Sequence, residues 1–379
     1  MASICGSPVC AGGKPKLKFT YTGDYVVRND GVVELLTSGT IVFLEPKVID
    51  VFMVGGGGKG GRCVMTNSPS YYTARGGGGG GYTRTLKRLA VQGSYEINIG
   101  AGSTAASVDG GSTAWGNAYT VLGGKSASEA PSAPTAAGPG MAGGSGGGGA
   151  VISNSDYGTG GSDGNNGEQG YFGTVAGGTG QGFTTREFGE ATGKLYAGGG
   201  GGGRYMSAQT PVVSMGGPGG GGTGGWAGSS SGQLQAPSAG GANTGGGGGG
   251  AAANYSGGMQ GGSGGSGIVC FREAQELPEL VGTWVLNARL YAPENDVYFN
   301  NQDFKIGDAS NPNRGTGRNL SCTTSKIWYT SYPSGYDVTV YTFSSNSWGS
   351  DKLNYFTFPA GATASDEFRA WLASNATKQ

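Results

Sequence analysis

The sequence predicts a mainly β protein with three parts: a β-sandwich base, an inserted polyglycine-II helix bundle, and a small β-rich C-terminal module that ends in one helix. Three observations predict this fold. Glycine is concentrated in runs in the middle of the chain, strand-like stretches enter and leave those runs, and the composition changes near residue 282. We expect an N-terminal arm over residues 1–16, the glycine-rich scaffold over 17–272, a connector over 273–281 and the module over 282–379.

Glycine runs dominate the middle of the chain. Of the 85 glycines, 6 precede residue 55 and 7 follow residue 267, which leaves 72 among the 213 residues between. Such runs can form a flexible linker, because glycine loses more entropy than any other residue when it is ordered. They can also form a bundle of extended helices with three residues per turn, because backbones without side chains approach closely. Runs of similar length recur between segments with Trp, Tyr, Met and Val, which favours the bundle.

Short β-branched or aromatic stretches predict the strands of the base. Before the first run they are Leu17–Tyr21, Tyr25–Val27, Val32–Leu36, Thr40–Leu44 and Ile49–Val54. Asn29–Gly31 predicts a hairpin turn, because Asn, Asp and Gly tolerate positive φ. Further strands are expected at Tyr82–Leu86, Tyr95–Ile99, Tyr119–Leu122 and Ile268–Phe271.

The C-terminal module is expected to consist of antiparallel strands followed by a helix. The expected strands are Thr283–Leu290, Val297–Ile306, Lys326–Ser331, Tyr336–Phe343 and Leu353–Phe358. Ser365 is expected to cap the helix, which places Phe368, Trp371 and Leu372 on one face.

Charge and residue usage exclude several classes of function. Lys and Arg together number 24, as do Asp and Glu, so the net charge is zero and no basic footprint for nucleic acid exists. No apolar run reaches the ~18 residues of a membrane span, so we expect no membrane insertion. Histidine is absent and the five cysteines lack zinc-ligand spacing, so no metal and no cofactor are expected. Cys5 and Cys10 are close enough in sequence to pair.

If each glycine run crosses the bundle once, the segments between successive runs lie alternately at its two ends. At ~3.1 Å per residue, six residues span roughly 18 Å. Ile49–Val54 marks the sheet end, and residues 226–244 are expected to return there. The segments expected at the opposite, distal end are residues 62–75, 150–157, 204–215 and 251–256.

The distal segments carry side chains that we interpret as a receptor-binding surface. These residues are Met65, Tyr71, Tyr72, Tyr157, Tyr205, Met206, Pro211 and Tyr255, with Val212 and Val213 beside Pro211. Aromatic residues on short loops of a rigid scaffold supply contact area at little entropic cost. The competing interpretation is that they plug the end of the bundle and shield its amides. Both interpretations stay open, since one side chain can do both.

The order of these segments resembles the glycine-rich domain found in phage and prophage tail proteins of gut Firmicutes. The resemblance covers roughly residues 17–272 and rests on Ile49–Val54 before four glycines, Gly76–Gly81 before Tyr82–Thr85, Gln181–Glu190, Leu195–Ala197 before six glycines, and Gly261–Val269. More distantly, the chain is similar to polyglycine-sandwich adhesins at the tips of phage tail fibres, whose distal loops bind the host receptor. Residues 282–287 and 371–376 are similar to a C-terminal module of phage proteins that those adhesins lack.

The resemblance implies a virion component of the tail or fibre, made in the cytoplasm of the bacterial host, and it transfers no catalytic residue. We therefore expect a tail-fibre or baseplate adhesin that binds a receptor and is not an enzyme. Its expected partners are a host-cell surface glycan or protein and other virion tail or fibre proteins, and a homo-oligomer such as a trimer stays open. The alternative is a structural virion protein, a fibre or capsid decoration, without receptor contact.

Three sequence patterns resemble functional motifs, but we do not interpret them as catalytic or ligand-binding sites. GxGxxG matches occur throughout the runs, but a phosphate loop needs a strand, one glycine-rich turn and a helix. Asp163–Glu168 lacks the alternating ligands of a calcium loop and is expected to be a turn. Arg186, Glu187 and Glu190 are expected to form a polar cluster at the scaffold edge, whereas a glycosidase needs two carboxylates across a cleft. An ice-binding or matrix protein is a further alternative, suggested by polyglycine alone.

Overall fold

The computed structural model describes residues 17–64, 72–128, 137–152, 159–161, 185–190, 192–206 and 214–274, and short pieces of residues 277–378. The chain divides into two compact units, Met1–Ala274 and Gln275–Gln379. Both units are built from strands, most of them antiparallel, so the prediction of a mainly β protein is confirmed. Among the described residues, no helix is long and apolar enough to cross a membrane.

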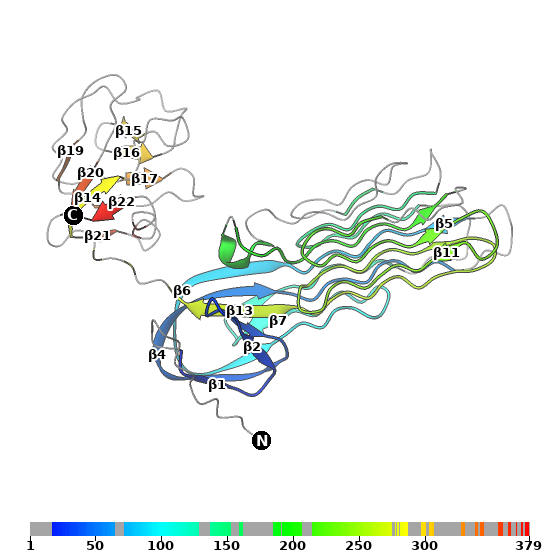
Figure 1. The fold of residues 1–379 in the computed structure, drawn as a ribbon, viewed down its shortest axis with the longest axis horizontal. Helices are drawn as coiled ribbons and strands as arrows, with labels where there is room; N and C mark the ends of the chain where they lie inside the picture. Colours follow the sequence, from blue (N-terminus) through cyan, green and yellow to red (C-terminus); the bar gives the residue numbers. More distant parts are fainter. Residues whose placement is uncertain are drawn as a thin grey trace. The chain divides into compact units, whose positions relative to one another are not determined.

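The base of the first unit is one eight-stranded antiparallel sheet (Figure 1). Its order is β2-β3-β13-β4-β6-β7-β8, and β1 pairs with the first half of β4. The strands are β1 (Phe19–Tyr21), β2 (Tyr25–Val27), β3 (Val33–Leu35), β4 (Gly39–Val54), β6 (Thr83–Asn98), β7 (Thr113–Trp115), β8 (Tyr119–Val121) and β13 (Ile268–Glu273). The predicted turn between β2 and β3 is confirmed, since the Gly31 N–H donates to the Arg28 carbonyl at 3.0 Å.

Two long strands, β4 and β6, carry this sheet, and each has 16 residues. The prediction of two separate strands in each segment was wrong, because the interruptions are irregularities in the pairing and not turns. One such irregularity lies between Phe43 and Lys47, where the register of β4 against β6 shifts. A second lies where Arg88 adopts a φ of 52°. The hydrogen bonding is therefore continuous through one sheet, where a β-sandwich would have two.

The second half of β4 is buried on both faces of the sheet. Val51 and Met53 belong to one apolar cluster, which also contains Trp115 and Phe271. Phe52, one position out of phase, belongs to another cluster, because successive side chains of a strand point to opposite faces. This double burial explains why Ile49–Val54 is an almost continuous apolar run and not an alternating one.

The glycine runs leave the sheet at one end and extend side by side to the short strands β5 (Thr73–Ala74) and β11 (Leu234–Gln235) (Figure 1). They are almost wholly buried, and their N–H groups donate to carbonyl oxygens of neighbouring runs. For example, Gly77 donates to Gly148 at 2.9 Å, Gly148 to Gly200 at 2.8 Å, and Gly200 to Gly78 at 2.9 Å. The flexible-linker interpretation of these runs was therefore wrong.

The contacts of a run repeat every three residues. Added Cβ atoms at Gly77, Gly78 and Gly79 would meet the carbonyl oxygens of Gly200, Gly58 and Ala142 at 2.0, 2.2 and 1.9 Å. At Gly80 the added atom would meet Ala197, which belongs to the same run as Gly200, at 2.0 Å. Three successive residues thus face three different neighbours, and no room for a side chain exists on any of the three sides.

The second unit contains three small sheets among its described residues. Their orders are β19-β20-β14-β22, β15-β16-β17 and β18-β21. The strands are β14 (Gly282–Leu286), β15 (Val297–Asn300), β16 (Asp303–Ile306), β17 (Ile327–Tyr329), β18 (Val338–Thr339), β19 (Thr342–Ser344), β20 (Tyr355–Phe358), β21 (Thr363–Ala364) and β22 (Ala376–Lys378). Within the segment of the predicted terminal helix, the structure describes Arg369 and Ala373, which are helical, while Ser365, Phe368, Trp371 and Leu372, on which the prediction rested, lie outside the described residues.

Candidate functional site

The distal end of the bundle is closed by short strands that follow the glycine runs. β5 pairs with β12 (Ala252–Ala253), while β9 (Arg204–Tyr205) pairs in parallel with β10 (Trp226–Ala227), which also pairs with β11. Alanine is frequent here because its single methyl group lets these strands approach almost as closely as glycine does. Ala74, Ala227 and Ala252 form a small buried cluster together with Ala150, Ile152 and Tyr205. The half-buried side chain of Tyr72 packs against this cluster.

Three tyrosines that the sequence placed at the distal end meet there. The rings of Tyr72 and Tyr205 are stacked, with their centroids 3.8 Å apart and their planes inclined by 17°. Tyr205 is buried, and its burial, followed by its contact with Tyr72 and the proximity of Tyr255, raises its pKa. Tyr255 is 37% exposed, and Tyr72 and Met206 are half-buried. Half-buried and exposed aromatic and sulfur-containing side chains thus lie beside a buried tyrosine.

The other predicted receptor-binding residues cannot be placed beside these side chains. Met65, Tyr71, Tyr157 and Pro211 lie outside the described residues, as do Val212 and Val213. Of the predicted residues that the structure describes, Tyr205 is buried, so its ring packs inside the end of the bundle and offers little surface to a partner. The prediction of an accessible site therefore rests on Tyr72, Met206 and Tyr255.

The expected position of residues 226–244 was wrong in its first half. Trp226 pairs with Arg204, so it lies at the distal end and not at the base. The chain returns to the base earlier, at Gly219, where an added Cβ atom would lie 2.6 Å from the Tyr196 carbonyl oxygen. It reaches the base again at Thr244, whose carbonyl accepts from the Ala197 N–H at 2.7 Å. The return of the chain to the base at Gly219 was not predicted. Pro218 and two glycines with positive φ, Gly219 and Gly220, make a turn there, within a segment that resembles a continuous glycine run in the sequence.

Asn254 is a distal residue that sequence reasoning missed. Its buried side-chain amide donates to the carbonyls of Gly228 at 2.7 Å and Ser230 at 3.2 Å, and its Oδ1 accepts from the Ser256 N–H at 2.9 Å. It therefore fixes the loop that presents Tyr255 against the loop after β10. A lone Asn among small residues gives no sequence signal for this role.

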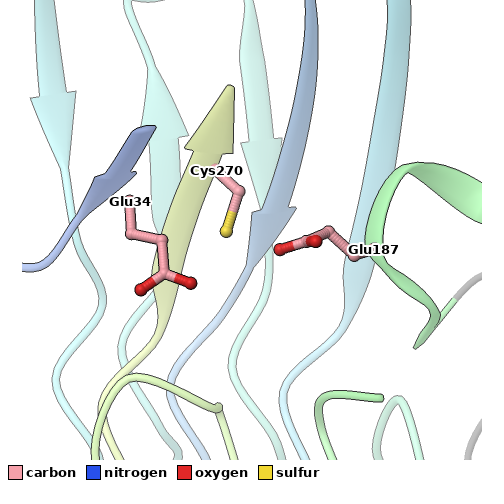
Figure 2. A group of neighbouring side chains, drawn as sticks. All are labelled: Glu34, Glu187 and Cys270. Atoms are coloured by element: carbon pink, nitrogen blue, oxygen red, sulfur yellow. The ribbon is translucent and has the colours of Figure 1, made fainter. Parts of the chain in front are cut away.

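A second cluster of polar side chains lies on the sheet at the base of the bundle. Figure 2 shows Glu34 from β3, Cys270 from β13 and Glu187 converging on one another, with their ligand atoms within 4.8 Å. Glu187 begins the 3-10 turn η2 (Glu187–Gly189). Two carboxylates and a thiol are a set of groups that a divalent metal ion can use.

The residues around this cluster fit an ion pair better than a metal. The Arg28 guanidinium donates to both oxygens of Glu187, at 2.8 and 2.7 Å, and to Glu34 at 3.1 Å. Its positive charge already neutralises the carboxylates. Burial, and then the Glu187 charge, raise the pKa of the Cys270 thiol, which opposes the thiolate that binds metals. Tyr196 completes the cluster by donating to Glu187 at 3.1 Å.

The turn η2 also contacts the sheet through Phe188 and Glu190, which both interact with Arg272 of β13. Phe188 adopts a φ of 54° and is buried, with the Arg272 guanidinium 4.2 Å from its ring centroid. Arg272 also forms an ion pair with Glu190 and donates to the buried Asp50 at 3.3 Å. Glu187 and Glu190 are thus each engaged by an arginine, so the cluster anchors the turn η2 on the sheet.

These features define a glycine-rich β protein, in which a sheet supports packed glycine runs with a side-chain rim at their far end. A family model described as a glycine-rich domain matches residues 37–274. The chain therefore belongs to this glycine-rich domain family. The matched range contains five of the eight strands of the sheet, β4, β6, β7, β8 and β13, and every glycine run, including the distal segments. Comparison with curated proteins finds no relative of the chain.

Proposed function

We propose that this chain is an adhesin of a phage tail fibre or baseplate, which presents the distal rim to a receptor on the host-cell surface. The rim consists of Tyr72, Met206 and Tyr255. The observation that carries the proposal is that hydrogen-bonded glycine runs hold loops from distant parts of the sequence together at one end, away from the sheet. Loops on a rigid scaffold commonly carry binding residues. The phage context comes from the resemblance of the glycine-rich segments to those of phage tail proteins.

The scaffold in this proposal is a polyglycine-II bundle. Its support is the three-residue repeat of the contacts, since this helix has three residues per turn. The hydrogen bonds repeat in the same way: Gly78 and Gly81 donate to Gly248 and Gly245 of one run, both at 2.8 Å. A bundle of this kind is held by backbone hydrogen bonds on all sides, so it can extend a binding surface far from the sheet without a large hydrophobic core.

The proposed role of the chain is binding without catalysis. Within the virion, the second unit, which has its own sheets, is the proposed attachment to other tail or fibre proteins. The alternative of a purely structural virion protein is favoured by one observation, the burial of Tyr205, because a plug needs no receptor. The exposure of Tyr255 beside it favours the adhesin, since a plug gains nothing from an exposed aromatic ring.

A cell-binding assay tests this proposal. The fluorescently labelled full-length chain is incubated with a panel of gut bacterial strains, and bound protein is measured by flow cytometry. We expect binding to a subset of strains, and we expect the Tyr72→Ala/Tyr255→Ala variant to lose at least ~90% of it, because truncation of central aromatic contacts commonly costs more than ~1.4 kcal/mol.

The matched control is Tyr119→Ala, which removes a half-buried tyrosine from the sheet at the opposite end of the bundle. It should bind like the wild type. Binding to none of the strains, or equal binding by the distal variant and the wild type, would contradict the adhesin proposal and favour the structural alternative.

A further inference from the structure

The distal end also carries three arginines, Arg62, Arg75 and Arg204, whose role the aromatic rim does not explain. Arg62 and Arg75 are half-buried, and Arg204 is buried, so that desolvation lowers its pKa. Guanidinium groups are weakly hydrated and bind carboxylate and phosphate groups with two parallel hydrogen bonds. Three of them at the end of a bundle of neutral glycines are a strong local charge.

Backbone hydrogen bonds hold these arginines at one level of the bundle, although they come from three different runs. The bonds are from the Ala251 N–H to the Gly61 carbonyl at 2.9 Å, from the Arg75 N–H to the Ala251 carbonyl at 2.9 Å, and from the Gly203 N–H to the Arg75 carbonyl at 2.8 Å. Arg62 directly follows Gly61, and Arg204 directly follows Gly203. The backbones of the three arginines are therefore neighbours in space.

The described carboxylates of the first unit lie away from these arginines. Every described carboxylate of residues 17–274 belongs to the sheet and its turns, to residues 187–190, or to Asp109, which accepts from Lys125 at 2.6 Å. In the loops next to the distal segments, residues 65–71, 153–158 and 207–213, the sequence contains one acid, Asp156. Among the described residues, the distal end thus carries arginines and no carboxylate, a distribution of charge that favours anions over cations.

The arginines lie directly beside the aromatic rim. Tyr205 follows Arg204 in β9, Tyr72 stacks on Tyr205, and Tyr255 lies close enough to influence the pKa of Tyr205. Apolar faces of sugar rings pack on aromatic rings, while phosphate or carboxylate substituents bind guanidinium groups. Nearby arginines and tyrosines therefore match a polymer that carries both sugars and negative charges.

We propose that the distal end binds an anionic surface polysaccharide, with Arg62 and Arg75 contacting its phosphate or carboxylate groups and Tyr72 and Tyr255 contacting its sugar rings. Arg204, which is buried, contributes positive potential without direct contact. This inference rests on the proposed function and specifies the chemical class of the receptor.

Immobilised polymers test the inference with the full-length chain. Poly(glycerol phosphate) and polygalacturonate supply phosphate and carboxylate groups, and dextran is the neutral reference. We expect binding to one or both polyanions, none to dextran, and a loss of affinity with added salt, because exposed charges are screened over about 10 Å at 0.1 M ionic strength. The polymer that binds better identifies the anionic group.

The Arg62→Gln/Arg75→Gln variant should bind the preferred polyanion about tenfold more weakly or worse, since two charge-assisted interactions are lost. The charge-matched control is Lys18→Gln/Arg84→Gln, which removes two exposed positive charges from the sheet and should bind like the wild type. If the glutamine variant does not fold by circular dichroism, Arg62→Lys/Arg75→Lys keeps the charge but loses the guanidinium fork, and we expect a smaller decrease in affinity.

Binding to neither polyanion, equal binding to dextran, or an equal loss in the control variant would overturn this inference. Its failure is distinguishable from failure of the proposed function. If polyanions do not bind while Tyr72→Ala/Tyr255→Ala still abolishes cell binding, only the receptor class is wrong. If the wild-type chain binds no cells, the adhesin proposal itself fails.

Discussion

The ring of Tyr72 covers the ring of Tyr205 at a centroid distance of 3.8 Å and an interplanar angle of 17°. Tyr205 lies on β9 and is buried, whereas Tyr72 precedes β5 and is half-buried. The stacked pair is therefore compatible with both interpretations of the distal aromatic residues, as a plug of the bundle and as a binding surface. The inner ring closes the end of the bundle, and it also supports the outer ring in the position that a partner would contact.

The inner ring of this stack is expected to determine stability. Tyr205→Ala should lower the free energy of unfolding by about 3 kcal/mol, because it leaves a cavity and removes the stack. Tyr205→Phe keeps the ring and should cost less than about 1 kcal/mol. Urea denaturation monitored by tryptophan fluorescence measures both. Equal costs for the two variants would show that the ring itself does not support the end of the bundle.

Substitution of three consecutive glycines tests the proposed polyglycine-II arrangement. Gly77→Ala, Gly78→Ala and Gly79→Ala should each cost about 3 kcal/mol or more, because each added methyl group meets a backbone carbonyl within 2.2 Å and the bundle must shift. The reason is that all three sides of the run are packed. Thermal unfolding followed by circular dichroism measures each variant.

The matched control for these variants is Gly257→Ala, where the added methyl group meets only the flexible end of Leu234, at 2.7 Å. Its melting temperature should stay close to that of the wild type. If one of the three consecutive variants were as stable as this control, that side of the run would be open, and the threefold packing would be wrong.

The ion pair between Arg28 and Glu187 is expected to anchor the turn η2 on the sheet. Glu187 is 5% exposed and accepts two hydrogen bonds from Arg28. Glu187→Gln should destabilise the first unit by about 2 kcal/mol, less than the loss of an isolated buried ion pair, because Asp30 and Glu34 still contact Arg28.

Glu273→Gln is the comparison for this variant, because Glu273 is exposed and forms an ion pair with the half-buried Lys47 at 3.4 Å. Exposed pairs contribute about 0–1 kcal/mol, so little change is expected. Chemical denaturation of both variants provides the measurement. A larger effect at Glu273 than at Glu187 would refute the anchoring role.

Alkaline pH is expected to destabilise the fold through Tyr196. Burial, followed by the proximity of Cys270 and Glu187, raises its pKa above the usual value of 10.0. The unfolded chain therefore releases this proton first, so stability is fully present below about pH 10 and falls as the pH rises further. Tyr196→Phe should flatten the fall between pH 10 and 11, although it is less stable at neutral pH because the hydrogen bond to Glu187 is lost. Parallel stability curves for wild type and variant would exclude this contribution.

The sequence predicts the strands of the base because their signals are local. Asn29–Gly31 makes the expected hairpin, and the apolar run Ile49–Val54 forms the strand that enters the first glycine run. The union of this strand with Thr40–Leu44 could not be predicted, because a bulge and a turn both appear as a break in the apolar pattern.

The candidate site was predictable only in part, for a similar reason. Tyr72 and Tyr255 follow from counting crossings, whereas Trp226 was misplaced because nothing local distinguishes a glycine that turns from one that continues. The contact of Arg28 with Glu187 joins residues 159 positions apart and depends on the whole fold. Such long-range pairs leave no periodic signal in a single sequence.

Hydroxyl-radical footprinting of the wild-type chain on bound cells tests most directly whether the distal end faces the host. The oxidation rates of Tyr72, Tyr255 and Tyr119 are compared by mass spectrometry in the free and the cell-bound protein. We expect cell binding to lower the oxidation of Tyr72 and Tyr255 severalfold and to leave Tyr119, on the sheet, unchanged. Protection of Tyr119 with no protection of Tyr72 and Tyr255 would contradict a receptor-binding distal end.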